Sequence, residues 1–347
     1  MKLTQKELCQ QYSALAQTNQ LIKDSKQTLN AFFKEKAPRA ILFTGCGSSF
    51  LLSCSFRSIA ASRTTLPVYA VAAGDLWINV QQYRSMLENT LIISVSRSGQ
   101  TSELVKAYEA VKAMDVHASF LSIVCSKNTP VYHLSDYCLE MPWAFDESVC
   151  QTRCVSNLYA AGAMVIGTLT QDGSIAQGMQ TVAQIGDDFL RRCEPTIKEI
   201  AKQPWNKVVV LADGEVDGLA EEASLAFNEI SQLPSNYYHI LDVRHGPMVL
   251  INHQTLVFIA LKSPLCAYEH ALVQDVLARG ANVIGYSQEA LPSIDGATMI
   301  ALGEDVGSVA GGMGLVLLCQ LMSCYKSVEV GCNPDTPDGL CPWVEIK

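Results

Sequence analysis

The sequence predicts an α/β protein of two tandem domains, each a doubly wound, three-layer unit in which helices flank a parallel β-sheet. Short apolar segments alternate with helical ones along the 347 residues, which is typical of β-α-β units. The same series of segments also occurs twice. AILFTGCG matches KVVVLADG about 167 residues later, and TLIISVSRS matches TLVFIALKS about 165 residues later. A nearly constant offset of this kind indicates an internal duplication.

The first half carries a helical segment and then the first domain. Residues 1–38 predict two short helices, over about 4–17 and 20–34. The first domain is expected over 39–170. Its elements, in order, are a strand with a glycine turn over 40–50, a helix to about Ala61, strands over 67–74 and 90–103, a helix that ends near Met114, strands over 119–126 and 137–142, and a long helix over about 151–169.

The second half begins with a polar helical connector over 171–204. The second domain is expected over 205–330. Its elements are a strand and turn over 207–218, a helix over 221–231, a strand over 255–264, a helix to Arg279, a strand over 282–288 and a final helix over about 308–326. Residues 331–347 form a C-terminal tail.

Composition excludes several classes of protein. Apolar residues make up 49% and charged residues 17%, which excludes a disordered chain and a coiled coil. The net charge is −9 and no Lys/Arg block occurs, so no nucleic-acid partner is expected. The apolar stretch over 306–325 contains glycines and serines and predicts a buried helix, not a membrane span. The N-terminus has no apolar signal core, so a cytoplasmic protein is expected.

The thirteen cysteines are spread over apolar segments and include no C-x-x-C pair. This pattern favours reduced, buried thiols that act as small hydrophobic residues. No metal site and no cofactor are expected, because zinc sites need clustered ligands.

Two polar loops follow central strands of the first half. Gly45-Cys46-Gly47-Ser48-Ser49 follows ILFT, and Ser96-Arg97-Ser98-Gly99-Gln100-Thr101 follows LIISV. Both run into helices, whose N-termini offer free N–H groups and partial positive charge. Glycines let the backbone approach an anion and hydroxyls add donors, so the pair predicts a phosphate-binding site. Either loop taken alone is better explained by helix capping, whereas two such loops at strand ends favour a phosphate site. Arg97 is equally well explained as a contributor of charge and as a solvated surface residue.

The corresponding loops of the second half are different. Ala212-Asp213-Gly214-Glu215 and Leu261-Lys262-Ser263-Pro264 lack the serine pattern, and the acids of the first would repel phosphate. Only the first half is therefore expected to bind phosphate.

Two residues of the second half are candidates for acid–base chemistry. Glu229 is expected on one helix face with Glu222, and His245 lies in the turn Arg244-His245-Gly246-Pro247. A carboxylate and an imidazole can divide base and acid work at neutral pH. Taken singly, Glu229 is also explained as a solvated helix acid and His245 as a hydrogen-bonded turn residue.

With these motifs in place, residues 38–347 resemble the double-SIS (sugar isomerase) family. More closely, the chain is similar to the isomerase half of glucosamine-6-phosphate synthase and to its stand-alone relatives. It is also similar to the tagatose-6-phosphate ketose/aldose isomerase-like proteins, the amino-sugar-phosphate deaminases and the fructosamine-6-phosphate deglycases. The motifs that carry the resemblance are G-C-G-S-S, S-x-S-G-x-T, E-S-V-x-Q-T-[RK] at Glu147–Arg153, N-E-I-S, R-H-G-P and the tail N-P-D-x-P.

The resemblance implies two SIS domains, a tail over the active site and a set of site residues. Glu229 is the implied base that moves a proton between C1 and C2 through an enediol or enolamine. His245 is implied to assist ring opening from the neighbouring subunit of a homodimer with shared active sites. The implied substrate-binding residues are Cys46, Gly47, Ser48 and Ser49 along the sugar phosphate, Ser96, Arg97, Ser98, Gln100 and Thr101 around the phosphate, and Glu147 and Thr152 near the sugar.

The implied function is an isomerase or deaminase of a hexosamine 6-phosphate or ketosamine 6-phosphate. Two lysines of the synthase are absent, because their positions hold Ala226 and Pro342 here. The chain also lacks the synthase's glutaminase domain, so glutamine-dependent amination is not expected of it. The alternatives are a fructosamine-6-phosphate deglycase and a non-catalytic phosphosugar sensor.

Overall fold

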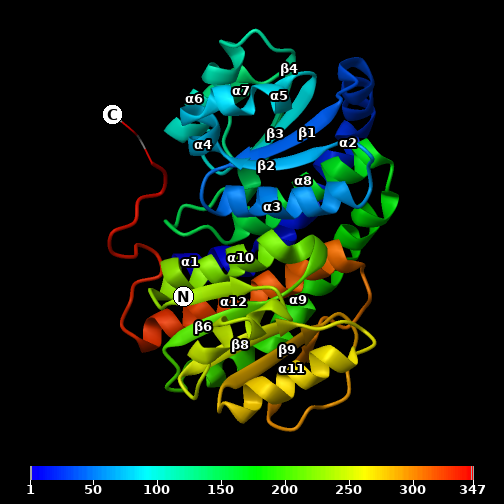
Figure 1. Ribbon diagram of the computed structural model, residues 1–347. Coiled ribbons are helices and arrows are strands. Elements are labelled where there is room, and N and C mark those ends of the chain that lie inside the picture. Colours follow the sequence, from blue (N-terminus) through cyan, green and yellow to red (C-terminus); the bar gives the residue numbers. More distant parts are fainter. Residues whose placement is uncertain (1, 345, 347) are drawn as a thin grey trace. The chain divides into compact units, whose positions relative to one another are not determined.

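The computed structural model describes residues 2–344 and 346, and the chain divides into two compact units. The N-terminal unit comprises Gln10–Glu147, Gln151–Gln180 and Cys341–Lys347. The C-terminal unit comprises Met1–Cys9, Ser148–Cys150 and Thr181–Leu340. Each unit contains one five-stranded parallel sheet with helices on both faces (Figure 1), so the predicted α/β class is confirmed.

The two sheets have the same topology. The N-terminal sheet has the order β2 (Val68–Ala72), β1 (Ala40–Gly45), β3 (Thr90–Ser96), β4 (Ala118–Val124) and β5 (Tyr137–Glu140). The C-terminal sheet has the order β7 (Ser235–Tyr238), β6 (Lys207–Leu211), β8 (Thr255–Ala260), β9 (Asn282–Ser287) and β10 (Ala297–Ala301). All pairs are parallel and each order follows the same chain sequence, as a duplication requires.

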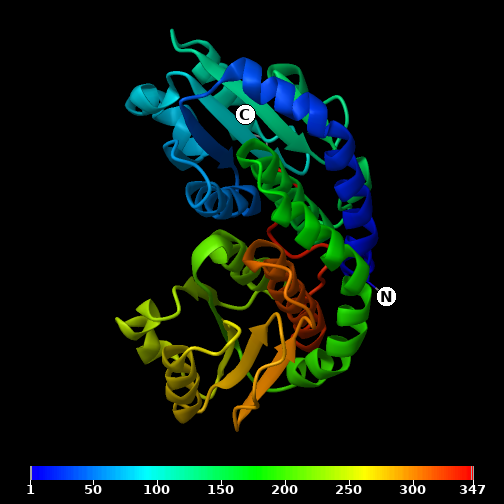
Figure 2. The ribbon, with the colours of Figure 1, turned by 90° about the vertical axis from the view of Figure 1, so that its right-hand side faces the viewer.

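Helices cover both faces of the N-terminal sheet. In Figure 1, α4 (Ala73–Ile78), α6 (Ser102–Lys112) and α7 (Pro130–Leu134) lie on one face, and α3 (Ser48–Ala61) and α8 (Arg153–Thr170) lie on the other. The long helix α2 (Gln11–Lys36) packs against α8 (Figure 2), and the short α5 spans Arg84–Leu87. Aromatic pairs fill both interfaces. Tyr108 of α6 lies 4.6 Å from Phe120, between ring centroids, and Phe56 of α3 lies 5.6 Å from Phe43.

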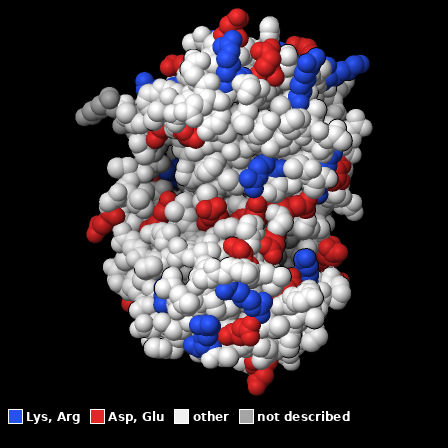
Figure 3. Space-filling model, viewed as in Figure 1, with Lys and Arg blue, Asp and Glu red and all other residues white. Residues whose placement is uncertain are grey.

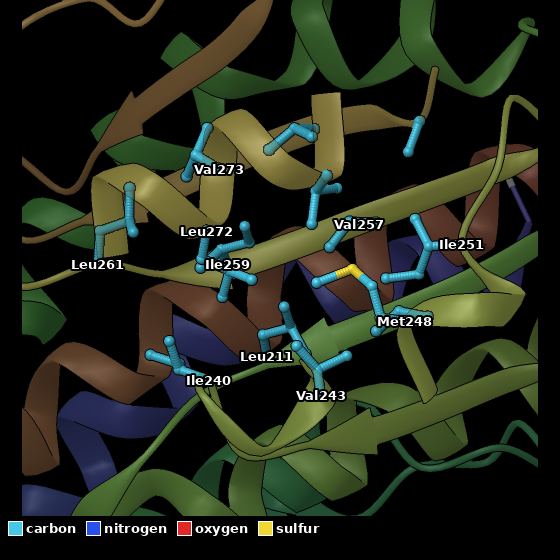
Figure 4. Close-up of a cluster of buried hydrophobic side chains, with 14 of the residues drawn as sticks. Leu211, Ile240, Val243, Met248, Ile251, Val257, Ile259, Leu261, Leu272 and Val273 are labelled. Carbon is cyan, nitrogen blue, oxygen red and sulfur yellow. The ribbon is translucent and has the colours of Figure 1, made fainter. Parts of the chain in front are cut away.

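The C-terminal unit is built in the same way. Its helices are α1 (Leu3–Cys9), most of α9 (Gly173–Ala201), α10 (Asp217–Ala226), α11 (Ala267–Ala278) and α12 (Ser308–Glu329). Figure 4 shows the core between the sheet and α11, where Val257 and Ile259 of β8 contact Leu272 and Val273 of α11. The same core includes four side chains of the loop that carries the site described below, namely Ile240, Val243, Met248 and Ile251.

The apolar stretch predicted as a buried helix is α12. By length and composition it is the one helix of the described chain that could cross a membrane, but 89% of its apolar window is buried inside the protein. Of the thirteen cysteines, only Cys341 is exposed. The remaining twelve are buried or half-buried, as expected of small hydrophobic residues.

Two sequence-based expectations differ from the structure. The break between the first two helices falls at Gln10 and not near residue 18, because residues 11–36 form one helix that packs along α8, where Thr18 Oγ1 donates to Asn157 Oδ1 over 2.6 Å. The strands β7 and β10 had no counterpart in the prediction. Both are edge strands with partly exposed side chains, so neither has the continuous apolar run that marks a buried parallel strand.

Candidate phosphate-binding site

The two serine-containing loops of the N-terminal unit meet at one edge of its sheet. β1 and β3 are neighbours, and their register pairs Thr44 with Ser94, so both strands end at the same level. From β1 the chain crosses to β2 on one side, and from β3 it crosses to β4 on the other. This reversal of strand order is where doubly wound sheets open a crevice for a ligand at the carboxyl ends of their strands.

The first loop needs its glycines for steric reasons. A Cβ on Gly45 would lie 2.7 Å from the Ser49 carbonyl carbon, and Gly47 has φ of +54°, a value that favours glycine. The turn brings Ser48 and Ser49 into the first turn of α3, where both are buried. The serines therefore lie at a helix N-terminus, as the sequence predicts.

The second loop is held by its own hydroxyl groups. Gly99 N donates to Ser96 Oγ over 3.0 Å, and Gln100 N donates to Ser98 Oγ over 3.2 Å. Gly99 has φ of +62°, and a Cβ there would lie 2.4 Å from Thr129 Oγ1. The loop then enters α6 directly after Thr101.

A small pocket lies between these loops. Six of the predicted residues line it, together with five that the sequence analysis did not assign to it. The predicted ones are Cys46, Ser49, Ser96, Arg97, Ser98 and Thr101, and the others are Val95, Leu104, Gln151, Pro342 and Trp343. Gly47, Ser48 and Gln100 belong to the same loops but do not line the pocket.

The starts of three helices converge on this pocket. Ser49 belongs to the first turn of α3, Thr101 precedes α6, and Gln151 lies two residues before α8. Helix N-termini attract anions through their orphan N–H groups and the helix dipole. On the face drawn in Figure 3, basic and acidic side chains are interspersed, so no continuous basic surface there attracts an anion from a distance. Binding would depend on the local donors.

Arg97 adds a full positive charge to these partial charges. Its side chain is only 4% exposed, so it belongs to the pocket wall and is not a solvated surface residue. Its Nη2 donates to the carbonyl of Pro342 in the C-terminal tail. A buried guanidinium with polar partners is the group that proteins use to recognise phosphate.

Cys46 contributes a neutral thiol. Burial first, and then the negative charge of Glu103, raise the pKa of the Cys46 thiol to about 12, against a smaller opposite effect of the Leu104 N–H. The group is therefore protonated at neutral pH, which excludes a nucleophilic thiolate beside the phosphate loop.

The motif Glu147–Arg153 divides into residues with different surroundings. Gln151 lines the pocket, whereas Glu147 is exposed and does not. Thr152 is fully buried, and its Oγ1 has no hydrogen-bond partner within the described chain. The start of α8 is capped by the buried Asp146, which accepts from Thr152 N (2.8 Å) and Cys154 N (2.9 Å). Asp146 thereby positions Gln151, and the sequence analysis did not identify it.

Glu229 lies in the C-terminal unit, on a π-helical turn. α10 ends at Ala226 and continues as η4 (Phe227–Ser231), and such π turns are frequent at functional sites. Asn228 ties this turn to β7 by accepting from Ser235 N over 2.8 Å. Glu229 is half-buried, whereas Glu222 is 1% exposed. The two acids, expected on one face, therefore differ in environment.

His245 is carried by a loop that is anchored at both sides. Val243 and Met248 insert into the core drawn in Figure 4, and Arg244 forms an ion pair with Asp275 of α11. Gly246 has φ of +127°, which turns the chain sharply after His245. The imidazole is left exposed on a fixed loop.

The structure thus gathers six predicted residues around one pocket in the N-terminal unit and places Glu229 and His245 in the C-terminal unit. Gln151 was within reach of sequence reasoning, because it lies inside a quoted motif. Trp343 had no sequence signal except its position after Pro342.

Comparisons with known proteins identify a family model and relatives that match the chain. The protein-family model described as the SIS domain matches residues 36–166 and 202–325 of the sequence. D-galactosamine-6-phosphate deaminase AgaS of Shewanella sp. (strain ANA-3) is 24% identical over 321 residues, which cover 88% of this chain and 79% of that protein. The isomerizing glutamine–fructose-6-phosphate aminotransferase of Methanothermobacter thermautotrophicus is 26% identical over 317 residues, 88% of this chain but 52% of that protein.

A solved structure shows the same fold. The crystal structure of tagatose-6-phosphate ketose/aldose isomerase from Escherichia coli superposes with a TM-score of 0.86 at 24% identity. The match covers 100% of this chain and 96% of that chain.

Proposed function

The chain belongs to the SIS domain family, and from this membership we propose that it is a phosphosugar isomerase or deaminase acting on a hexosamine 6-phosphate or ketosamine 6-phosphate. The observation that carries the proposal is the pocket at the carboxyl ends of β1 and β3. Residues at the starts of three helices line this pocket together with the buried Arg97. Such a set of donors around one space is suited to bind an anion, and capping of a single helix does not account for it. The names of the curated relatives, a galactosamine-6-phosphate deaminase among them, support an amino-sugar phosphate.

The proposed chemistry assigns the proton transfer to Glu229. Its carboxylate takes the proton from C2 of an open-chain hexosamine 6-phosphate and returns it to C1 through an enolamine. The resulting C2 imine takes up one water and yields a ketose 6-phosphate and ammonia. With a ketosamine 6-phosphate the proton moves from C1 to C2, and hydrolysis of the C1 imine releases an amine, as in a deglycase.

Exchange of one carboxylate tests this assignment. Glu229→Gln keeps the shape of the side chain but removes the base, so we expect turnover to fall by 10²-fold or more, the usual contribution of acid–base catalysis. The assay measures ammonia release and ketose formation from hexosamine 6-phosphates. Glu221→Gln, at an exposed acid of the preceding helix, is the matched control and should keep full activity. Full activity of Glu229→Gln would refute the assignment.

The same assay separates the alternatives. Release of an amino acid from a ketosamine 6-phosphate, without ammonia, identifies a deglycase. Binding of phosphosugars without turnover of any of them identifies a sensor.

We also propose a homodimer in which His245 serves the site of the neighbouring subunit. A mixture of Glu229→Gln and His245→Asn chains, unfolded together and refolded, then contains dimers with one intact pair of residues. Activity should return in the mixture although each variant alone is inactive. Mass spectrometry shows whether mixed dimers have formed. If they have and the mixture is as inactive as each variant alone, the proposal that His245 serves the neighbouring site is wrong. His253→Asn, at another exposed histidine, is the control.

A further inference from the structure

The C-terminal tail is bonded to the phosphate pocket of its own unit. Arg97 donates to the carbonyl of Pro342, and Ser102 N donates to the carbonyl of Val344 over 3.4 Å. Ile346 N donates in turn to Ser102 Oγ over 3.0 Å. Pro342 and Trp343 also form part of the pocket wall. The tail is otherwise exposed, so these contacts hold it in place.

The donors that bind the tail are the donors that an anion needs. Arg97 carries the full charge of the pocket, and Ser102 N–H belongs to the first turn of α6. In the structure both are directed to peptide carbonyl oxygens, which are weaker acceptors than phosphate oxygens. The Pro342 carbonyl therefore takes up the charged donor of the pocket, and the Val344 carbonyl takes up an N–H at the start of α6.

The space left in the pocket leads to the same conclusion. Its volume is about 30 Å³, and a water molecule needs roughly 10–15 Å³ by this measure. About two waters fit, whereas a phosphate group has four oxygens. Pro342 and Trp343 form part of the wall around this space, so movement of the tail would enlarge it.

We propose that the tail segment beginning at Cys341 is an internal competitor of phosphate, which occupies Arg97 and the start of α6 and is displaced when a phosphate group binds. The inference rests on the proposed phosphate site. In the free protein the tail then blocks the site in part of the molecules. The apparent affinity for anions is lowered accordingly, because only molecules with a displaced tail can bind.

Truncation after Leu340 tests the competition without any turnover. Inorganic phosphate is titrated by calorimetry against the full chain and the truncated chain at constant ionic strength. We expect roughly tenfold tighter binding to the truncated chain. Trp343→Gly removes a side chain by which the tail lines the pocket, so it should also tighten phosphate binding. This variant provides the test if truncation impairs folding. Equal affinities for all three proteins would overturn the inference and leave the phosphate site standing. Absence of phosphate binding in all three would overturn both.

Amide exchange gives the direction of the tail movement. Hydrogen–deuterium exchange of the peptide containing residues 341–347 is followed in phosphate and in chloride at equal ionic strength. Displacement predicts faster exchange in phosphate, because the Ile346 amide loses its bond to Ser102. Slower or unchanged exchange would mean that the tail closes over the anion or ignores it, and either result would overturn the inference.

Discussion

Replacing Arg97 by methionine should weaken phosphate binding strongly while leaving the fold intact. Arg97 is 4% exposed and lines the pocket, so a bond from its guanidinium to a phosphate oxygen would be shielded from water. A hydrogen bond with a charged partner contributes about 1.5–3 kcal/mol. At about 1.4 kcal/mol per tenfold change, loss of one such bond weakens binding roughly 10- to 150-fold. Methionine keeps most of the apolar stem and limits the cavity.

The measurement is best made in the chain truncated after Leu340. Arg97 also binds the Pro342 carbonyl, so in the full chain the substitution would release the tail and mask part of the loss. Calorimetric titration with inorganic phosphate gives the dissociation constant. Lys127→Met, at an exposed lysine that follows β4, is the control for a general change in charge. A change below threefold for Arg97→Met, or an equal loss in the control, would refute the assignment of Arg97.

Three further predictions concern the architecture around the pocket. Asp146→Asn should lower the free energy of unfolding by about 1–3 kcal/mol in urea denaturation, because the buried carboxylate caps α8; an unchanged midpoint would contradict this. Gly99→Ala should cost about 1–3 kcal/mol and shift the loop, since its Cβ would meet Thr129 Oγ1 at 2.4 Å, and thermal melting with phosphate titration measures both effects. Burial, assisted by the charge of Glu103, raises the pKa of Cys46 to about 12, so its thiol is protonated at pH 8. Mass spectrometry after brief treatment with iodoacetamide at pH 8 should therefore find Cys341 alkylated and Cys46 unmodified.

Much of the fold could be predicted because buried parallel strands have a strong local signal. β1, β3, β6 and β8 lie inside their sheets, and each contains a continuous apolar run of at least three residues that is visible in the sequence. The edge strands β7 and β10 lack that run and were not predicted. The helix break near residue 18 was predicted wrongly, since residues 11–36 form one helix that packs against α8, a helix far along the chain.

The candidate site likewise has parts that the sequence could predict and parts that it could not. The loops at Gly45–Ser49 and Ser96–Thr101 could be identified because glycine and serine at the start of a helix are a local pattern. The buried position of Arg97 could not be predicted, because it depends on the neighbouring strands and on the tail. Glu229 and His245 were chosen from residue type and motif, and their roles stay predictions.

The sequence alone determined the α/β class, the duplication and the two loops, because each is expressed within a few consecutive residues or as a constant offset. Only the tertiary structure decided which side chains face the pocket. Gln151 and Trp343 reach it from segments distant in the chain, and the tail takes up the donors that an anion needs. Contacts of this kind depend on how the sheet, three helix starts and the tail converge, and no short stretch of sequence contains that information.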